Sequence, residues 1–166
     1  DEYSQTSVEN IYAIGDVTSR TNLTPVAIRD GHAFADTIYN QRPTPVDHAC
    51  IPSAVFGRPP IGTVGLTETD ARRSHAAVDI YKTNFRPMRT VFVGNEQRTL
   101  MKLVVNGNND RVLGVHIAGP DAPEMIQLAA IAVKAGITKK QWDSTMALHP
   151  TAAEEIVLMR EKVKST

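Results

Sequence analysis

Residues 100–117 read Leu-Met-Lys-Leu-Val-Val-Asn-Gly-Asn-Asn-Asp-Arg-Val-Leu-Gly-Val-His-Ile. Two runs rich in aliphatic and β-branched residues, 100–105 and 111–117, flank a cluster of turn-forming residues at 106–109. A parallel crossover needs roughly a dozen or more residues, so strands joined by so short a turn must run antiparallel. The stretch therefore predicts neighbouring strands of an antiparallel sheet.

Similar patterns continue on both sides of this pair. Short apolar runs separated by Gly, Pro and Asn turns predict further strands at 51–56, 61–66, 78–85 and 88–93. N-cap residues followed by apolar residues at helical spacing predict helices at 67–74, 121–135, 138–142 and 151–163. Together they predict an α+β fold, a largely antiparallel sheet of about five strands flanked by helices.

The composition of the chain changes near residue 45. Residues 40–50 are mostly polar and contain two prolines, which is typical of a linker. Before this linker, residues 8–17 predict a buried strand that ends at a Gly-Asp turn, and residues 24–39 predict a helix with Thr24 as its cap. We therefore expect one part at 1–45 and a second domain at 46–166.

Charge and composition exclude several classes of function. The chain has 18 basic and 18 acidic residues, with no long basic run, which argues against nucleic acid or an anionic membrane as a partner. No apolar run approaches the roughly 20 residues of a membrane span, and the first residues lack a signal-peptide pattern, so we expect a cytoplasmic protein. Cys50 is the single cysteine, which leaves no internal redox pair. No metal site is predicted.

The candidate chemistry lies in His149-Pro150-Thr151-Ala152-Ala153-Glu154-Glu155. Thr151 and Glu154 have the spacing of a capping box, in which the glutamate folds back over the helix N-terminus. The carboxylate then lies where His149 arrives, and a hydrogen bond to one ring nitrogen would leave the other nitrogen free. This arrangement is a general acid/base pair in outline. From spacing alone, a purely structural cap beside a surface histidine remains the alternative.

Residues 147–160, Ala-Leu-His-Pro-Thr-Ala-Ala-Glu-Glu-Ile-Val-Leu-Met-Arg, resemble the C-terminal signature of glutathione reductases, within the pyridine nucleotide-disulfide oxidoreductase family. The resemblance implies that His149 is the acid/base of thiol–disulfide exchange and that Glu154 orients it. It also implies that 46–166 is the dimerisation (interface) domain of a homodimer. The His149-Pro150 segment would then meet the flavin and the active site of the other subunit.

A second match covers residues 2–27, which resemble the second flavin-binding segment of the same enzymes. Residues 1–45 would then be the end of an FAD-binding domain, a strand and a helix. The resemblance implies that Gly15 and Asp16 lie at the ribityl or pyrophosphate part of FAD and that the backbone at Thr24 meets the isoalloxazine ring. His32 stands where some glutathione reductases have an arginine that binds substrate.

The substrate contacts follow from a third match. Phe85-Arg86-Pro87-Met88 and the second glutamate of Ala-Ala-Glu-Glu resemble the bacterial or plant-like enzymes. This resemblance implies that Arg86, Met88 and Glu155 contact glutathione disulfide.

The chain contains neither a GxGxxG fingerprint nor a CxxxxC pair, so it corresponds to the last third of such an enzyme. The intact protein is expected to use FAD and NADPH. The chain alone is expected to be an inactive homodimer without tightly bound FAD. Trypanothione reductase and lipoamide dehydrogenase share the His-Pro-Thr element, and a free-standing dimerisation module is the alternative of another class.

Overall fold

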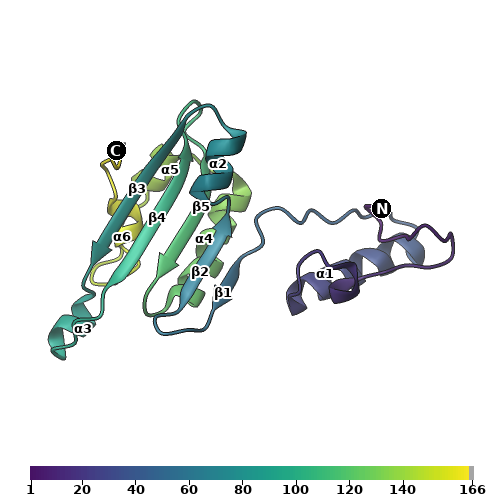
Figure 1. Cartoon of the computed structure of the whole chain (residues 1–166), viewed down its shortest axis with the longest axis horizontal. Helices are drawn as coiled ribbons and strands as arrows, with labels where there is room; N and C mark the ends of the chain where they lie inside the picture. Colours follow the sequence, from purple (N-terminus) through teal and green to yellow (C-terminus); the bar gives the residue numbers. More distant parts are fainter. Residues whose placement is uncertain (165–166) are drawn as a thin grey trace. The chain divides into compact units, whose positions relative to one another are not determined.

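The computed structural model describes residues 1–164. The chain forms two compact units, Asp1–His48 and a second unit that begins at Ala49. Figure 1 shows helix α1 (Thr24–Ile38) in the first unit and an open sheet with its helices in the second. Among the described residues, no helix has both the length and the apolar character needed to cross a bilayer.

The second unit is built on a five-stranded sheet in which every neighbouring pair is antiparallel. The spatial order is β1-β2-β5-β4-β3, so the pair predicted at 100–117 lies inside the sheet as β4 and β5. The predicted α+β fold is confirmed. The strands are β1 (Ser53–Val55), β2 (Ile61–Gly65), β3 (Val78–Phe85), β4 (Thr99–Asn106) and β5 (Val112–Ala118).

One face of the sheet is covered by α4 (Ala122–Ala135), which packs across β2 and β5 (Figure 1). Met101 and Leu103 of β4 are fully buried on this face, together with Ile126 of α4. Removing side chains of this size from water contributes about 1.5–3 kcal/mol each. As predicted, α4 ends at Ala135, and the following Gly136 has a φ of 70°, which glycine adopts at little cost. These buried side chains belong to the main hydrophobic core of the second unit.

The other face of the sheet carries α2 (Glu68–Ser74), where Ala71 packs on Ile80 and Val104. Thr67 is the N-cap, and its hydroxyl oxygen accepts a hydrogen bond from the backbone N–H of Asp70 at 3.1 Å. The predicted helix at 67–74 is therefore present, with Thr67 as its cap.

His116 of β5 lies on the α2 face, where it is opposite Lys102 of β4 in the ladder. Its Nε2 lies 3.1 Å from the carbonyl oxygen of Leu66, and its Nδ1 lies 2.6 Å from the Thr63 hydroxyl. A neutral ring satisfies both contacts by donating from Nε2 and accepting at Nδ1. Burial and the nearby Lys102 ammonium lower the pKa of His116, against the opposing effect of the Leu66 hydrogen bond. The Lys102 ammonium is itself paired with Glu68 of α2.

We expect acidification to destabilise the second unit through His116. Because the folded state holds the pKa of His116 below its usual 6.5, the unfolded chain binds more protons in the pH window just below 6.5. The free energy of unfolding therefore falls as the pH drops through this window. Thermal unfolding followed by circular dichroism between pH 7 and 5 should show a smaller loss of Tm in His116→Gln, which keeps a donor and an acceptor. Equal losses in both proteins would contradict this assignment.

The predicted strand at 88–93 is wrong, because Met88–Phe92 form a short helix, α3. The β3–β4 ladder ends where Phe85 pairs with Thr99, so the residues between them run past the end of the sheet. The backbone N–H groups of Thr90 and Val91 donate instead to the carbonyl oxygen of Pro87. Phe92 is 92% exposed, so its apolar side chain does not pack into the sheet.

The predicted final helix at 151–163 is much shorter, since α6 spans only Glu155–Leu158. Met159 has a non-helical ψ of 88°, and the chain then runs alongside β3. There the N–H of Val163 donates to the carbonyl oxygen of Ile80 at 2.7 Å. Met159 is buried, whereas Val163 is 48% exposed. Edge pairing with β3 replaces the last helical turns.

The first unit contains α1 and the 3-10 turn η1 (Gly15–Thr18). The strand predicted at 8–17 is wrong: within the described residues this segment pairs only through a Gln5–Tyr12 bridge. A buried strand needs hydrogen-bonded neighbours, and in this unit the segment has no second strand beside it. Thr24 is the first residue of α1 rather than its cap, which is Leu23.

Candidate active site

The loop between α5 (Lys139–Ser144) and α6 carries His149. Its apolar side chains point into solvent, with Met146 94% exposed and Leu148 73% exposed. The His149–Pro150 peptide bond is cis. The Thr151 hydroxyl donates to the carbonyl oxygen of Leu148 at 2.8 Å, which closes the loop immediately around the histidine.

The predicted capping-box hydrogen bonds form in this loop. The N–H of Glu154 donates to the Thr151 hydroxyl oxygen at 3.1 Å, and the N–H of Thr151 donates to Glu154 Oε1 at 3.3 Å. These two bonds fold the glutamate side chain back toward His149, although the helix itself begins only at Glu155. The direction of the carboxylate is therefore set by local backbone geometry.

His149 and Glu154 form a direct pair. The Nδ1 atom of His149 lies 3.0 Å from Oε1 and 3.1 Å from Oε2 of Glu154. A carboxylate only accepts, so Nδ1–H is the donor and the neutral ring presents an unprotonated Nε2. Nε2 has no hydrogen-bond partner among the described residues. The His149 side chain is 71% exposed, whereas the Glu154 side chain is 14% exposed. This Nε2 atom therefore belongs to an exposed ring that is held by a largely buried carboxylate.

An open cleft of about 530 Å³ lies beside this pair. His149 and Glu154 line it together with Glu155, with Arg86 from the β3–α3 connection and with Met88 from the start of α3. The structure thus brings these five predicted site residues to one surface, although Arg86 and His149 are far apart in the sequence. The Nε–H of Arg86 donates to the carbonyl oxygen of Asn95 at 2.9 Å, which fixes the side chain at the rim of the cleft.

The cleft also contains an ion pair that sequence reasoning missed. Arg89 of α3 lies 2.9 Å from Asp121, the residue before α4, and both side chains are more than half exposed. Exposed pairs of this kind contribute about 0–1 kcal/mol, so their effect on stability is small. The pair places one positive and one negative charge on the wall of the cleft. The sequence held no signal for the contact, because it depends on 88–92 being a helix.

The predicted flavin residues Gly15, Asp16 and Thr24 all lie in the first unit. Gly15 has a φ of 65°, and a Cβ there would lie 2.9 Å from Cβ of Ala27, so η1 packs closely on α1 only with glycine at this position. Asp16 and Thr24 are exposed. The Asp16 carboxylate makes no hydrogen bond within the described residues. His32 is an exposed residue of α1.

Comparison with known proteins gives a consistent result. The family model for the pyridine nucleotide-disulphide oxidoreductase dimerisation domain matches residues 51–160. A glutathione reductase of Burkholderia cepacia is 53% identical over 162 residues, covering 98% of this chain and 36% of that protein. The chloroplastic/mitochondrial glutathione reductase of Pisum sativum is 52% identical, covering 96% of this chain and 29% of that protein.

A trypanothione reductase of Leishmania donovani is more distant. It is 44% identical over 162 residues, which cover 96% of this chain and 33% of that protein. The chain therefore spans about a third of the length of the relatives it matches.

Proposed function

Because the chain belongs to the family of pyridine nucleotide-disulphide oxidoreductase dimerisation domains, we propose that it is the C-terminal part of a glutathione-disulfide reductase that uses NADPH and FAD. The identity to glutathione reductases, 52% to 54%, exceeds the 43% and 44% to trypanothione reductases, which supports glutathione disulfide as the substrate. The chain alone, about a third of such a protein, is proposed to be inactive.

The observation that carries this proposal is the His149–Glu154 pair at the cleft. Nε2 of His149 would hold a proton and deliver it to the sulfur of the leaving glutathione thiolate when the disulfide bond breaks. The ring would then be neutral again, with Nδ1–H still donated to Glu154 at 3.0 Å. While the ring is charged, the carboxylate stabilises it, and it fixes the tautomer at all times.

The charges of the cleft support a zwitterionic peptide as its ligand. Arg86 and Arg89 offer guanidinium groups to carboxylates, and Glu155 offers a carboxylate to an ammonium group. Met88 is 61% exposed and gives the same wall an adaptable apolar surface. Glutathione disulfide carries carboxylates, ammonium groups and an apolar disulfide, so we propose Arg86, Met88 and Glu155 as its contacts. His32 is a further candidate in place of an arginine.

The first unit is proposed to be the end of an FAD-binding domain. Its residues fit a flavin cofactor, because Asp16 has an exposed carboxylate without a partner among the described residues and the N-terminus of the 15-residue helix α1 is exposed at Thr24. Gly15, Asp16 and Thr24 would hold FAD, with His149 and Pro150 reaching it from the other subunit. When bound, FAD passes the electrons of NADPH toward the disulfide.

We also propose that the chain forms a homodimer through α4. The inner side of this helix is buried on the sheet, yet its outer side is also apolar, with Leu128 69% exposed and Ile131 63% exposed. Next to it an apolar groove of about 230 Å³ is lined by α4, α5 and α6. A two-fold contact would cover the same patch on both copies.

The proposed function is tested by assaying the full-length protein that contains this chain. The purified protein should carry FAD and oxidise NADPH in the presence of glutathione disulfide, with a kcat/KM at least tenfold above that for trypanothione disulfide or lipoamide. Preference for another disulfide would reassign the substrate. A protein without flavin or NADPH oxidation would support the dimerisation module instead.

A further inference from the structure

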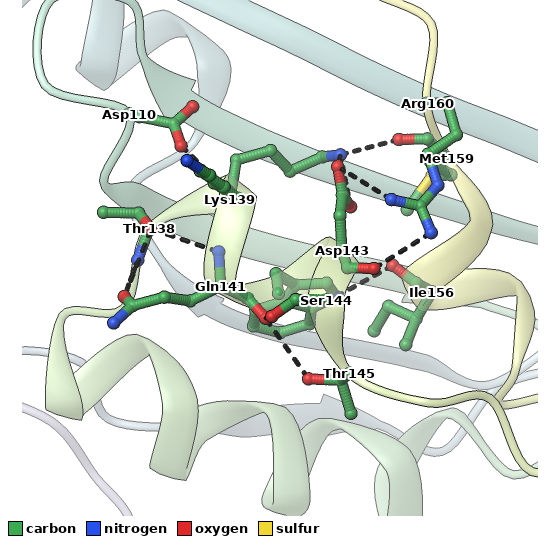
Figure 2. Close-up of polar contacts among 12 residues, drawn as sticks. Asp110, Thr138, Lys139, Gln141, Asp143, Ser144, Thr145, Ile156, Met159 and Arg160 are labelled. Carbon is green, nitrogen blue, oxygen red and sulfur yellow. Dashed lines mark hydrogen bonds and ion pairs between the residues drawn. The ribbon is translucent and has the colours of Figure 1, made fainter.

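Lys139, the first residue of α5, is a buried lysine outside the lining of the cleft, with 3% of its side chain exposed. Its ammonium donates to both carboxylate oxygens of Asp143 at 2.6 Å and to the carbonyl oxygen of Met159 at 2.7 Å. It also lies 4.0 Å from the ring centre of Tyr81 on β3. Figure 2 shows the long side chain of Lys139 reaching from α5 toward Asp143 and the chain at Met159. The ammonium thus connects α5, β3 and the segment after α6.

Two further contacts join α5 to the same segment. The indole N–H of Trp142 donates to the carbonyl oxygen of Ile156 at 2.8 Å. The guanidinium group of Arg160 donates to the carbonyl oxygen of Asp143 at 2.9 Å (Figure 2). Residues 156–160 are therefore held on α5 at three points, through Ile156, Met159 and Arg160. We call Lys139, Trp142 and Asp143 the α5 clamp.

The α5 clamp acts on the residues that follow Glu154 directly. Glu154 is the N-cap residue of α6, two residues before the carbonyl group that Trp142 holds. On the other side of the glutamate, the capping bonds with Thr151 direct the carboxylate, but the loop that carries His149 is open to solvent and has no packed support from the described residues. The place where the Glu154 carboxylate meets the ring thus depends on how firmly α6 is seated.

We propose that Lys139 is a positioning residue for the His149–Glu154 pair, acting through Met159 and α6; the catalytic meaning of this role rests on the proposed function. A buried ammonium is costly unless it is fully paired, and an apolar side chain of similar length would fill the space at lower cost. An apolar side chain would, however, leave the Met159 carbonyl without its directional partner. The lysine fixes where α6 ends, and with it the position of the short helix that begins directly after Glu154.

The tautomer of His149 tests this proposal without an activity assay. In the 166-residue chain labelled with ¹⁵N, the ring nitrogens should report an Nδ1–H tautomer above about pH 8, where imidazole is neutral. His149→Gln identifies the signal among the five histidines. Lys139→Met should shift the ring toward the Nε2–H tautomer, which a free imidazole prefers in water, while Lys139→Arg should keep Nδ1–H because a guanidinium group can still donate to the Met159 carbonyl.

Lys102→Met is the control, because Lys102 also pairs with a carboxylate, that of Glu68, but lies on the α2 face. It should leave the His149 tautomer unchanged. If Lys139→Met fails to fold by circular dichroism, Trp142→Phe decides in its place, since it removes the hydrogen bond to Ile156 and keeps an aromatic side chain in the core. An unchanged Nδ1–H tautomer in the deciding variant, or an equal shift in the control, overturns the proposal. A full-length protein without reductase activity would refute the function and not this coupling.

Discussion

Replacing His149 with alanine in the full-length protein is expected to lower turnover with glutathione disulfide by about 10²- to 10⁴-fold, the usual scale for general acid/base catalysis. The variant loses the ring whose Nδ1 is held by Glu154 and whose Nε2, beside the cleft, is free of hydrogen bonds to the described residues. Reduction of the flavin by NADPH should stay unchanged, because that half-reaction takes no proton from this ring. Stopped-flow flavin absorbance separates the two half-reactions.

His75→Ala is the control for this experiment. His75 follows α2, pairs locally with Ser74 and lies outside the residues that line the cleft. It should leave both half-reactions unchanged. A His149→Ala protein that loses flavin reduction to the same extent as disulfide turnover would show a structural role. Glu154→Gln should lie between wild type and His149→Ala, because an amide can still accept a hydrogen bond from Nδ1–H but does not stabilise the charged ring.

The sheet could be predicted from the sequence because its turns are local signals. Gly107, Asn108 and Asn109 lie between β4 and β5, and the strands on both sides are rich in apolar residues. The strand predicted at 88–93 was wrong, because these apolar residues have no neighbouring strand in the described part of the chain and form a helix. The strand predicted at 8–17 was wrong because this segment also has no neighbouring strand there. A strand forms only where a second chain segment pairs with it, and a local run of apolar residues does not show whether such a segment is present.

In the candidate site, too, the local features could be predicted from the sequence and the long-range contacts could not. The His149–Glu154 pair was predictable, because the capping box is local and both of its hydrogen bonds lie within residues 151–154. The length of the following helix was not, because it depends on the Lys139 ammonium and on pairing with β3. The cleft is lined by residues from two segments that are far apart in the sequence, 85–91 and 149–155. Lining residues such as Arg86 were identified only through a family resemblance.

Ile131→Asp is expected to convert the chain from a dimer to a monomer. Ile131 is 63% exposed on α4, so the substitution spares the core of each copy but places a carboxylate in the apolar patch that a two-fold contact would bury twice. Light scattering at micromolar concentration should give twice 18.1 kDa for the wild type and 18.1 kDa for the variant, with matching circular dichroism.

Val93→Asp is the control for the dimer, since Val93 is 73% exposed but follows α3 and is not part of α4. It should remain dimeric, because a carboxylate at that position stays in water. A monomeric wild type would contradict the proposed homodimer, and a dimeric Ile131→Asp would place the interface elsewhere than α4. Since the proposed mechanism needs His149 and Pro150 of one subunit at the flavin of the other, Ile131→Asp in the full-length protein should also lose disulfide turnover as it dissociates. On dilution of this variant, disulfide turnover and the mass measured by light scattering should fall together.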